Sequence, residues 1–128
     1  NTQEVCILSY EYELIQVLIN ILNNAKDELL EKEIKEKYIF IDIKVKENVE
    51  ITIKDNAGGI PTKLLHKIFK QHFTTKSKQN GTGIGLYMSN MIITKNLKGE
   101  IKVSNKKFTY KNTDYKGAEF KIILPHEI

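Results

Sequence analysis

Two glycine-rich segments decide how this chain folds: Asn80-Gly81-Thr82-Gly83-Ile84-Gly85-Leu86 and, upstream of it, Asp55-Asn56-Ala57-Gly58-Gly59-Ile60. Glycine lets the backbone approach a ligand closely and adopt dihedral angles that other residues resist. A helical pattern follows the second segment, and the first amide groups of a helix are unpaired and attract anions, most often phosphate. The sequence therefore predicts a nucleotide-binding domain.

The two commonest phosphate-binding loops are excluded by their context. A P-loop needs a glycine followed directly by Lys-Ser or Lys-Thr, and no glycine of this chain has that neighbour. A dinucleotide-binding fingerprint follows a buried strand, whereas residues 74–80 are polar throughout. The Gly-x-Gly-x-Gly pattern alone is also compatible with an ordinary loop.

Length and composition fit one soluble domain that spans residues 1–128. Apolar residues make up 41% of the chain, which is enough for a core, and no apolar run reaches the length of about 20 residues needed to span a membrane. The single cysteine, Cys6, cannot form an internal disulfide, which favours a reducing, cytoplasmic location. We expect no membrane contact by this domain itself.

The charge pattern does not favour a nucleic-acid partner. The net charge is +4 and every basic residue is lysine, whereas guanine is usually read by arginine. The lysines alternate with acidic residues, most densely in residues 31–37, and this pattern is typical of a solvated surface.

Hydrophobic periodicity predicts alternating helices and strands. The spacing indicates helices over residues 11–35, 63–69 and 84–97, and strands over residues 5–8, 38–46, 49–54, 100–104 and 118–124, with a loop or hairpin at 106–115. The apolar face of the first helix holds Leu14, Leu18, Ile21, Leu22, Ala25 and Leu29. The expected fold is a two-layer α/β sandwich.

Three polar residues form a stripe beside the apolar face of the first helix. Asn20, Asn24 and Asp27 are spaced by four and three residues, so they lie on one side of the helix. Amide oxygens are hard ligands that suit Mg²⁺. The alternative is a row of ordinary surface residues.

Asp55 continues the alternation of Ile51 and Ile53, so its carboxylate points to the core side at the end of its strand. A buried carboxylate needs a partner, and the amino group of adenine is one candidate. The alternative is an aspartate that caps the turn after it. Lys76, in the polar loop that follows, is placed to close over a triphosphate or is simply a solvated lysine.

Taken in order, these segments resemble the GHKL ATPase superfamily, and specifically the catalytic domain of sensor histidine kinases. Residues 20–25 resemble its N box, 55–61 its first G box, 69–76 its F box and 81–86 its second G box. Residues 117–125 are similar to its closing strand. The resemblance covers nearly the whole chain, and the order of four motifs is far more specific than any one of them.

The resemblance implies a Bergerat fold, in which helices cover one face of a mixed sheet, and a site for ATP and Mg²⁺ under a lid at residues 62–80. It implies that Asn24 coordinates Mg²⁺ with help from Asn20, and that Asp55 accepts the adenine amino group. It assigns catalysis to Asn20, Asn24 and Lys76. It assigns nucleotide binding to Asn24, Asp55, Gly59, Ile60, Phe73, Thr75, Lys76, Gly81, Thr82, Gly83, Ile84, Gly85 and Leu86.

The resemblance also implies a reaction. Branches that hydrolyse ATP carry a glutamate at the position of Asn20, and an amide has no useful basicity. Transfer of the γ-phosphoryl group to a histidine is therefore favoured, on a separate helical domain that this chain lacks. The implied partners are that domain, which forms the homodimer of the full-length protein, and a response regulator. The alternatives are a GHKL ATPase, a serine-directed anti-sigma kinase and a degenerate ATP-binding module.

Four residues depart from the family pattern. Ala57 replaces a glycine of the first G box, and Asp27 and Glu28 stand where a lysine and an aromatic residue are frequent. Ala118 stands where a threonine is frequent in the closing strand.

Overall fold

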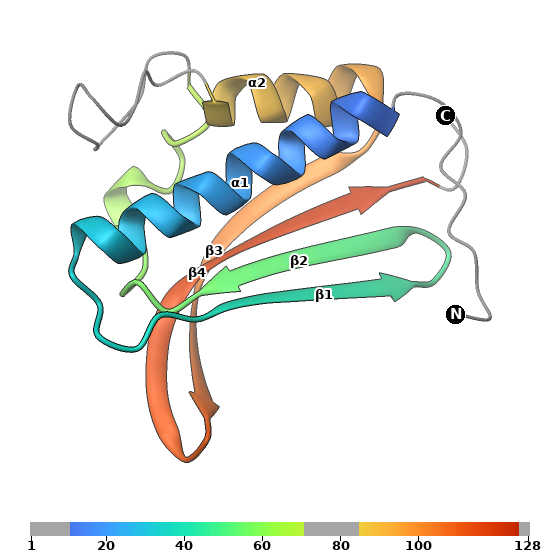
Figure 1. Cartoon of the computed structure of the whole chain (residues 1–128). Coiled ribbons are helices and arrows are strands. Elements are labelled where there is room, and N and C mark those ends of the chain that lie inside the picture. The colour runs from blue at the N-terminus through green and yellow to red at the C-terminus, as the bar shows by residue number, and fades with distance from the viewer. Residues whose placement is uncertain (1–10, 71–84, 126–128) are drawn as a thin grey trace.

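The protein is represented by a computed structural model that describes residues 11–70 and 85–125. In chain order the elements are α1 (Glu11–Glu31), β1 (Ile39–Val45), β2 (Val49–Asp55), the 3-10 helix η1 (Thr62–Leu64), α2 (Gly85–Met91), the π-helical turn η2 (Ile92–Asn96), β3 (Glu100–Tyr110) and β4 (Thr113–Leu124). The helices α1 and α2 lie side by side over one face of the sheet (Figure 1).

The four described strands form one sheet in the order β1-β2-β4-β3, and each neighbouring pair is antiparallel. The predicted two-layer α/β sandwich is therefore confirmed. The expected mixed sheet is not seen among these four strands, because two hairpins and the β2–β4 pairing supply only antiparallel neighbours. The strand expected at residues 5–8 lies outside the described residues.

The core lies between the helices and the inner face of the sheet. Burial alternates along β2 without exception, from Val49 to Asp55. Val17 and Ile21 of α1 have no exposed surface and pack onto this face with Ile53. The alternation of apolar and polar residues predicted for this strand is therefore confirmed as an alternation of buried and partly exposed side chains. Burial of the apolar side chains holds the two layers together.

The three expected helices differ in extent or type from those observed. The first ends at Glu31 rather than at residue 35, and Glu33 takes a left-handed φ of 53°, a conformation common just after a helix end. The expected helix at 84–97 changes from α2 to the π-turn η2 after Met91. The short helix expected at 63–69 is reduced to η1.

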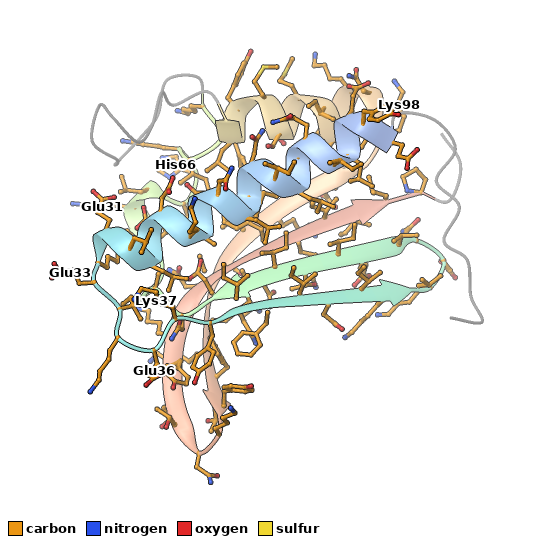
Figure 2. All side chains as sticks on the ribbon, viewed as in Figure 1. Glu31, Glu33, Glu36, Lys37, His66 and Lys98 are labelled. Atoms are coloured by element: carbon orange, nitrogen blue, oxygen red, sulfur yellow. The ribbon has the colours of Figure 1, made fainter. Side chains whose placement is uncertain are left out.

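The charged connection after α1 is exposed, as the sequence indicated. Glu33, Glu36 and Lys37 are exposed and lie in this connection (Figure 2). Lys32 is exposed as well, but its ammonium group makes contacts that are described with the site below.

The third and fourth strands form a hairpin that is longer than predicted. The region 106–115 is strand on both sides of a two-residue turn at Lys111 and Asn112, whose φ angles are 49° and 62°. Positive φ at both positions defines the turn type that best matches strand twist. The hairpin extends beyond the helices (Figure 1), where edge-to-face rings join it to β1, with Phe40 and Tyr110 centred 4.9 Å apart. The open end of the hairpin, at Gly117, lies against Asp55.

Candidate functional site

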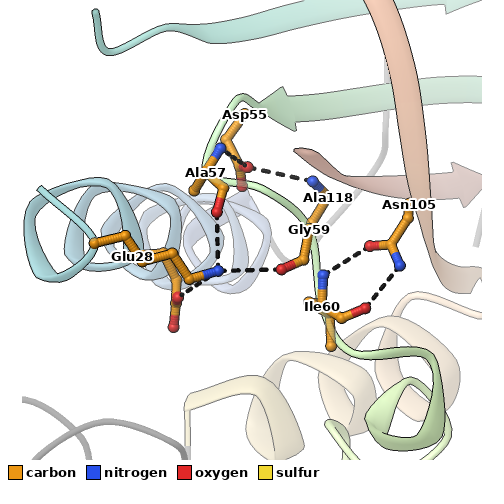
Figure 3. Close-up of polar contacts among 8 residues, drawn as sticks. Glu28, Asp55, Ala57, Gly59, Ile60, Asn105 and Ala118 are labelled. Carbon is orange, nitrogen blue, oxygen red and sulfur yellow. Dashed lines mark hydrogen bonds and ion pairs between the residues drawn. The ribbon is translucent and has the colours of Figure 1, made fainter. Parts of the chain in front are cut away.

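Asp55 ends β2 and is 5% exposed. Its Oδ1 accepts the N–H groups of Ala57, at 2.9 Å, and Ala118 of β4, at 3.2 Å (Figure 3). The carboxylate therefore lies on the helix-covered side of the sheet, as its parity with Ile51 and Ile53 predicted. The alternative of an aspartate that caps the turn after it is seen in the bond from Ala57, and the adenine contact stays a prediction.

The environment of Asp55 works against its charge. Burial raises the pKa of this carboxyl above its ordinary value, and the N–H groups of Ala57 and Ala118 and the positive charge of Lys32 only partly oppose that rise. Glu28 raises the pKa further. A buried carboxylate of this kind is stabilised by any additional hydrogen-bond donor that reaches it.

The turn after Asp55 needs its two glycines. Gly58 has φ of 89° and Gly59 has φ of 88°, a region that side chains make unfavourable. The Gly58 N–H donates to the Lys116 carbonyl at 2.9 Å. Ala57, which departs from the family pattern, is not among the described residues with positive φ, so its methyl group is compatible with this turn.

Two side chains clamp the turn from opposite sides (Figure 3). The Lys32 ammonium donates to the carbonyls of Ala57, at 2.8 Å, and Gly59, at 3.1 Å. Asn105 of β3 accepts the N–H of Ile60 and donates to its carbonyl, both at 2.7 Å. Each residue from 57 to 60 therefore has at least one backbone group bonded to Lys32, Asp55, Lys116 or Asn105.

Asn56 fixes the same turn to the connection that precedes β1. Its Oδ1 accepts the N–H of Tyr38 at 2.9 Å, and its Nδ2 donates to the carbonyl of Glu36 at 2.6 Å. The residue is 5% exposed, and both of these hydrogen bonds are partly buried.

We expect Asn56→Ala to lower the free energy of unfolding by about 2 kcal/mol, because it removes two hydrogen bonds and leaves partly buried backbone groups without partners. Urea unfolding at neutral pH measures this. Asn23→Ala, an exposed change on α1, serves as the control and should stay within about 0.5 kcal/mol of the wild type. Equal stability of the two variants would contradict the role given to Asn56.

Asn20 joins the two helices. Its Nδ2 donates to the Gly85 carbonyl at 3.4 Å and to Ser89 Oγ at 3.3 Å, and its Oδ1 accepts from Gln16 at 3.0 Å. Ser89, which has no exposed surface, donates in turn to the Gly85 carbonyl at 2.8 Å. Asn20 thus holds the first turn of α2, at the end of the second glycine-rich segment, against α1.

Asn24 lies one turn further along α1 and is half-buried. In the chain it lies between Asn20, which contacts α2, and Lys32, which contacts the Asp55 turn. Lys32 follows Asn20 by twelve positions, and at the helical rise this corresponds to about 18 Å along α1. The helix therefore meets the start of α2 near its middle, at Asn20, and the Asp55 turn at its C-terminal end.

The structure brings several predicted site residues into these two places. Asp55, Gly59 and Ile60 share the first turn, and Asn20 contacts Gly85, which Leu86 follows. Leu86 is half-buried and packs against the core. The predicted residues that lie outside the described ones are Phe73, Thr75, Lys76, Gly81, Thr82, Gly83 and Ile84.

Three residues that build the site were not identified from the sequence. Gly117 passes so close to β2 that a Cβ placed on it would lie 1.6 Å from the Asp55 carbonyl oxygen, and a glycine inside a strand is a signal of such close approach. Lys32 offers only its spacing of four from Glu28, to which it is paired at 3.4 Å. Asn105 has no local signal.

Within residues 11–70 and 85–125, no three His, Cys, Asp or Glu side chains gather as a metal site. No helix among the described residues is long and apolar enough to cross a membrane.

Comparisons with known proteins identify the family. Residues 10–128 match the family described as histidine kinase-, DNA gyrase B- and HSP90-like ATPase. The chain is 34% identical to the two-component sensor PprA of Pseudomonas aeruginosa over 128 aligned residues. This alignment covers 97% of this chain and 13% of PprA. It is 35% identical to sporulation kinase A of Bacillus subtilis over 113 aligned residues. This alignment covers 88% of this chain and 16% of that kinase.

A solved structure agrees with these relatives. The nucleotide-free catalytic domain of the histidine kinase ThkA superposes with a TM-score of 0.70 at 28% identity, over 93% of this chain and 70% of that one. The chain spans less than a fifth of the length of the two curated relatives. The chain belongs to the histidine kinase-, DNA gyrase B- and HSP90-like ATPase family, and within it to the ATP-binding catalytic domains of sensor histidine kinases.

Proposed function

We propose that this domain binds Mg-ATP and donates the γ-phosphoryl group to a histidine on a separate helical domain, in a two-component signalling protein of the cytoplasm. The observation that carries the proposal is the buried Asp55 carboxylate at the mouth of a turn whose backbone is fixed from three sides. A downstream response regulator would then receive the phosphoryl group, as the two-component name of a relative suggests.

Adenine recognition falls to Asp55. Its Oδ1 is occupied by the N–H groups of Ala57 and Ala118, so we assign Oδ2 to the amino group of the base. Gly58 and Gly59 have no side chains to obstruct a flat ring beside this carboxylate. A donor from adenine would also relieve part of the burial penalty on the charge.

The amide oxygens of α1 fit a magnesium ion chemically, because Mg²⁺ prefers hard oxygen ligands and retains several waters and phosphate oxygens. We assign the ion to Asn24. When bound, the ion neutralises charge on the transferring phosphoryl group. Asn20 would assist by holding the start of α2 in place through its contacts with Gly85 and Ser89. The phosphates themselves would bind to residues 81–86 and Lys76.

Asn20 also supports transfer over hydrolysis. An amide cannot act as a general base toward water, and the Asn20 amide is already engaged with Gln16, Gly85 and Ser89. An ATPase or a serine-directed kinase would use the same nucleotide site. The acceptor histidine is itself a nucleophile, so positioning and charge neutralisation are what this domain needs to supply.

We expect Asn24→Ala to abolish the Mg²⁺ dependence of ATP binding and to reduce phosphotransfer to the helical domain by about a hundredfold, since one ligand of the ion is lost. Calorimetric titration of ATP and GTP, with and without Mg²⁺, measures the first effect. Radiolabel transfer in the longer protein that contains both domains measures the second.

Asn23→Ala is the matched control, because it makes the same change at the adjacent, exposed position. Binding of ATP by wild type with no preference over GTP would overturn the adenine assignment. Unchanged transfer by Asn24→Ala would overturn the metal assignment.

A further inference from the structure

Lys32 crosses from the end of α1 to the turn that presents Asp55. Its backbone N–H donates to the Glu28 carbonyl at 3.0 Å, so it still belongs to the last helical turn. Its ammonium group donates to the carbonyls on both sides of Gly58, those of Ala57 and Gly59. The same ammonium is paired with the Glu28 carboxylate at 3.4 Å.

This contact selects one conformation of a flexible segment. Two consecutive glycines lose more backbone freedom on ordering than any other pair of residues. One ammonium that bonds the carbonyls of both Ala57 and Gly59 requires both carbonyls to face the end of α1. The N–H of Ala57, on the other side of the same residue, bonds Asp55 Oδ1, and that bond orients the carboxylate.

We propose that Lys32 is a positioning residue for adenine recognition: it holds the Gly58-Gly59 turn and, through it, the Asp55 carboxylate in the geometry that receives the base. The inference rests on the proposed function and adds to it a residue that lies outside every motif of the family resemblance. Asn105 secures the far end of the same turn, at Ile60, so removal of Lys32 loosens the turn without releasing it.

The charge of Lys32 gives this role a signature that a purely structural contact lacks. The charged side chains that act on Asp55 are Lys32, which favours the ionised form, and Glu28, which opposes it. From β4 only the backbone N–H of Ala118 acts on it. Removing the ammonium raises the pKa of Asp55 further, so an interaction that needs the carboxylate is lost at a higher pH when the solution is acidified.

The test compares Lys32→Met with Lys35→Met in the 128-residue chain. Both variants remove one positive charge from the same exposed run, but Lys35 lies beyond the clamp. The Lys32 side chain is 41% exposed, so both variants should fold. Titration with Mg-ADP at neutral pH should show affinity about tenfold weaker for Lys32→Met and unchanged for Lys35→Met, because a charged hydrogen-bond donor has been lost.

Two further readouts separate positioning from general weakening. The acid limb of the affinity profile should move to higher pH in Lys32→Met, and Lys32→Arg should restore the wild-type limb, since guanidinium keeps the charge and several donors. Without nucleotide, hydrogen exchange at the amides of Ala57 and Gly58 should become faster in Lys32→Met only.

Each outcome supports or overturns the positioning role of Lys32. If wild type binds Mg-ADP but Lys32→Met and Lys35→Met behave alike, the positioning role is wrong and the proposed function stands. If Lys32→Arg has the acid limb of Lys32→Met, the charge has no part and the inference fails. If wild type binds no Mg-ADP at any pH, the proposed function and this inference both fail.

Discussion

Gly117→Ala is expected to lower the free energy of unfolding by about 3 kcal/mol and to abolish nucleotide binding, because overpacking against rigid backbone is strongly destabilising. A Cβ at this position would lie 1.6 Å from the carbonyl oxygen of Asp55 and 2.9 Å from its Oδ1. Backbone atoms cannot rotate away as the end of a side chain can. The ends of β2 and β4 must therefore separate, and the separation displaces the N–H of Ala118 from the carboxylate.

Urea unfolding at neutral pH measures the stability of this variant, and calorimetry with Mg-ATP measures its binding. Gly85→Ala is the matched control for stability, since the nearest atom to a Cβ there is Asn20 Cγ at 3.9 Å, an ordinary contact. Gly→Ala without a clash is neutral or stabilises by about 0.4–1 kcal/mol. If the two variants unfold at the same urea concentration, the close approach of β4 to Asp55 is wrong.

Gly117 shows which kind of feature the sequence could predict and which kind it could not. A glycine inside a strand signals that something approaches closely, and that signal is local. The identity of its neighbour depends on the register of β4 on β2, in which Lys54 pairs with Glu119. Register follows from tertiary packing, because each partner lies more than sixty residues away in the chain.

The features that were predicted correctly depend on the residues of one element. The alternation of β2 placed Asp55 on the core side because side chains of a strand alternate between faces whatever lies next to them. The same holds for Ile21, Ala25 and Leu29, which are buried on one side of α1 as the helical spacing predicted.

The features that were missed depend on contacts between elements. The sequence indicated a loop or hairpin at 106–115 and did not separate the two, because this region extends beyond the helices and has no core to alternate against. Its rings pack instead on β1, with Phe108 against Phe40. Lys32 and Asn105 bond to backbone carbonyls and amides. Because every residue carries these backbone groups, the sequence does not show which of them need a side-chain partner.

Asp55→Asn is expected to weaken adenine nucleotide binding by about a hundredfold while it leaves the fold intact, since it removes a charged acceptor. The asparagine oxygen keeps the N–H groups of Ala57 and Ala118, which fix its position at Oδ1. The amide NH₂ must then occupy the place of Oδ2, where it presents donors to the amino group of adenine. Titration with ATP measures the loss, and equal affinity in the two proteins would end the assignment of Asp55 to the base.

The stability of Asp55→Asn distinguishes a binding residue from a structural one. Because burial raises the pKa of Asp55 in the folded state above that of the unfolded chain, the folded protein binds the proton more tightly. The wild type therefore loses stability as pH rises through the folded-state pKa and regains it below the unfolded value. Asparagine has no such dependence, so the variant should be at least as stable as wild type at neutral pH, and its advantage should disappear as the solution is acidified. Urea unfolding across this range measures the difference. A variant that is less stable at neutral pH, with a deficit that shrinks on acidification, would mean that the carboxylate stabilises the fold by its charge and is not held there for a ligand.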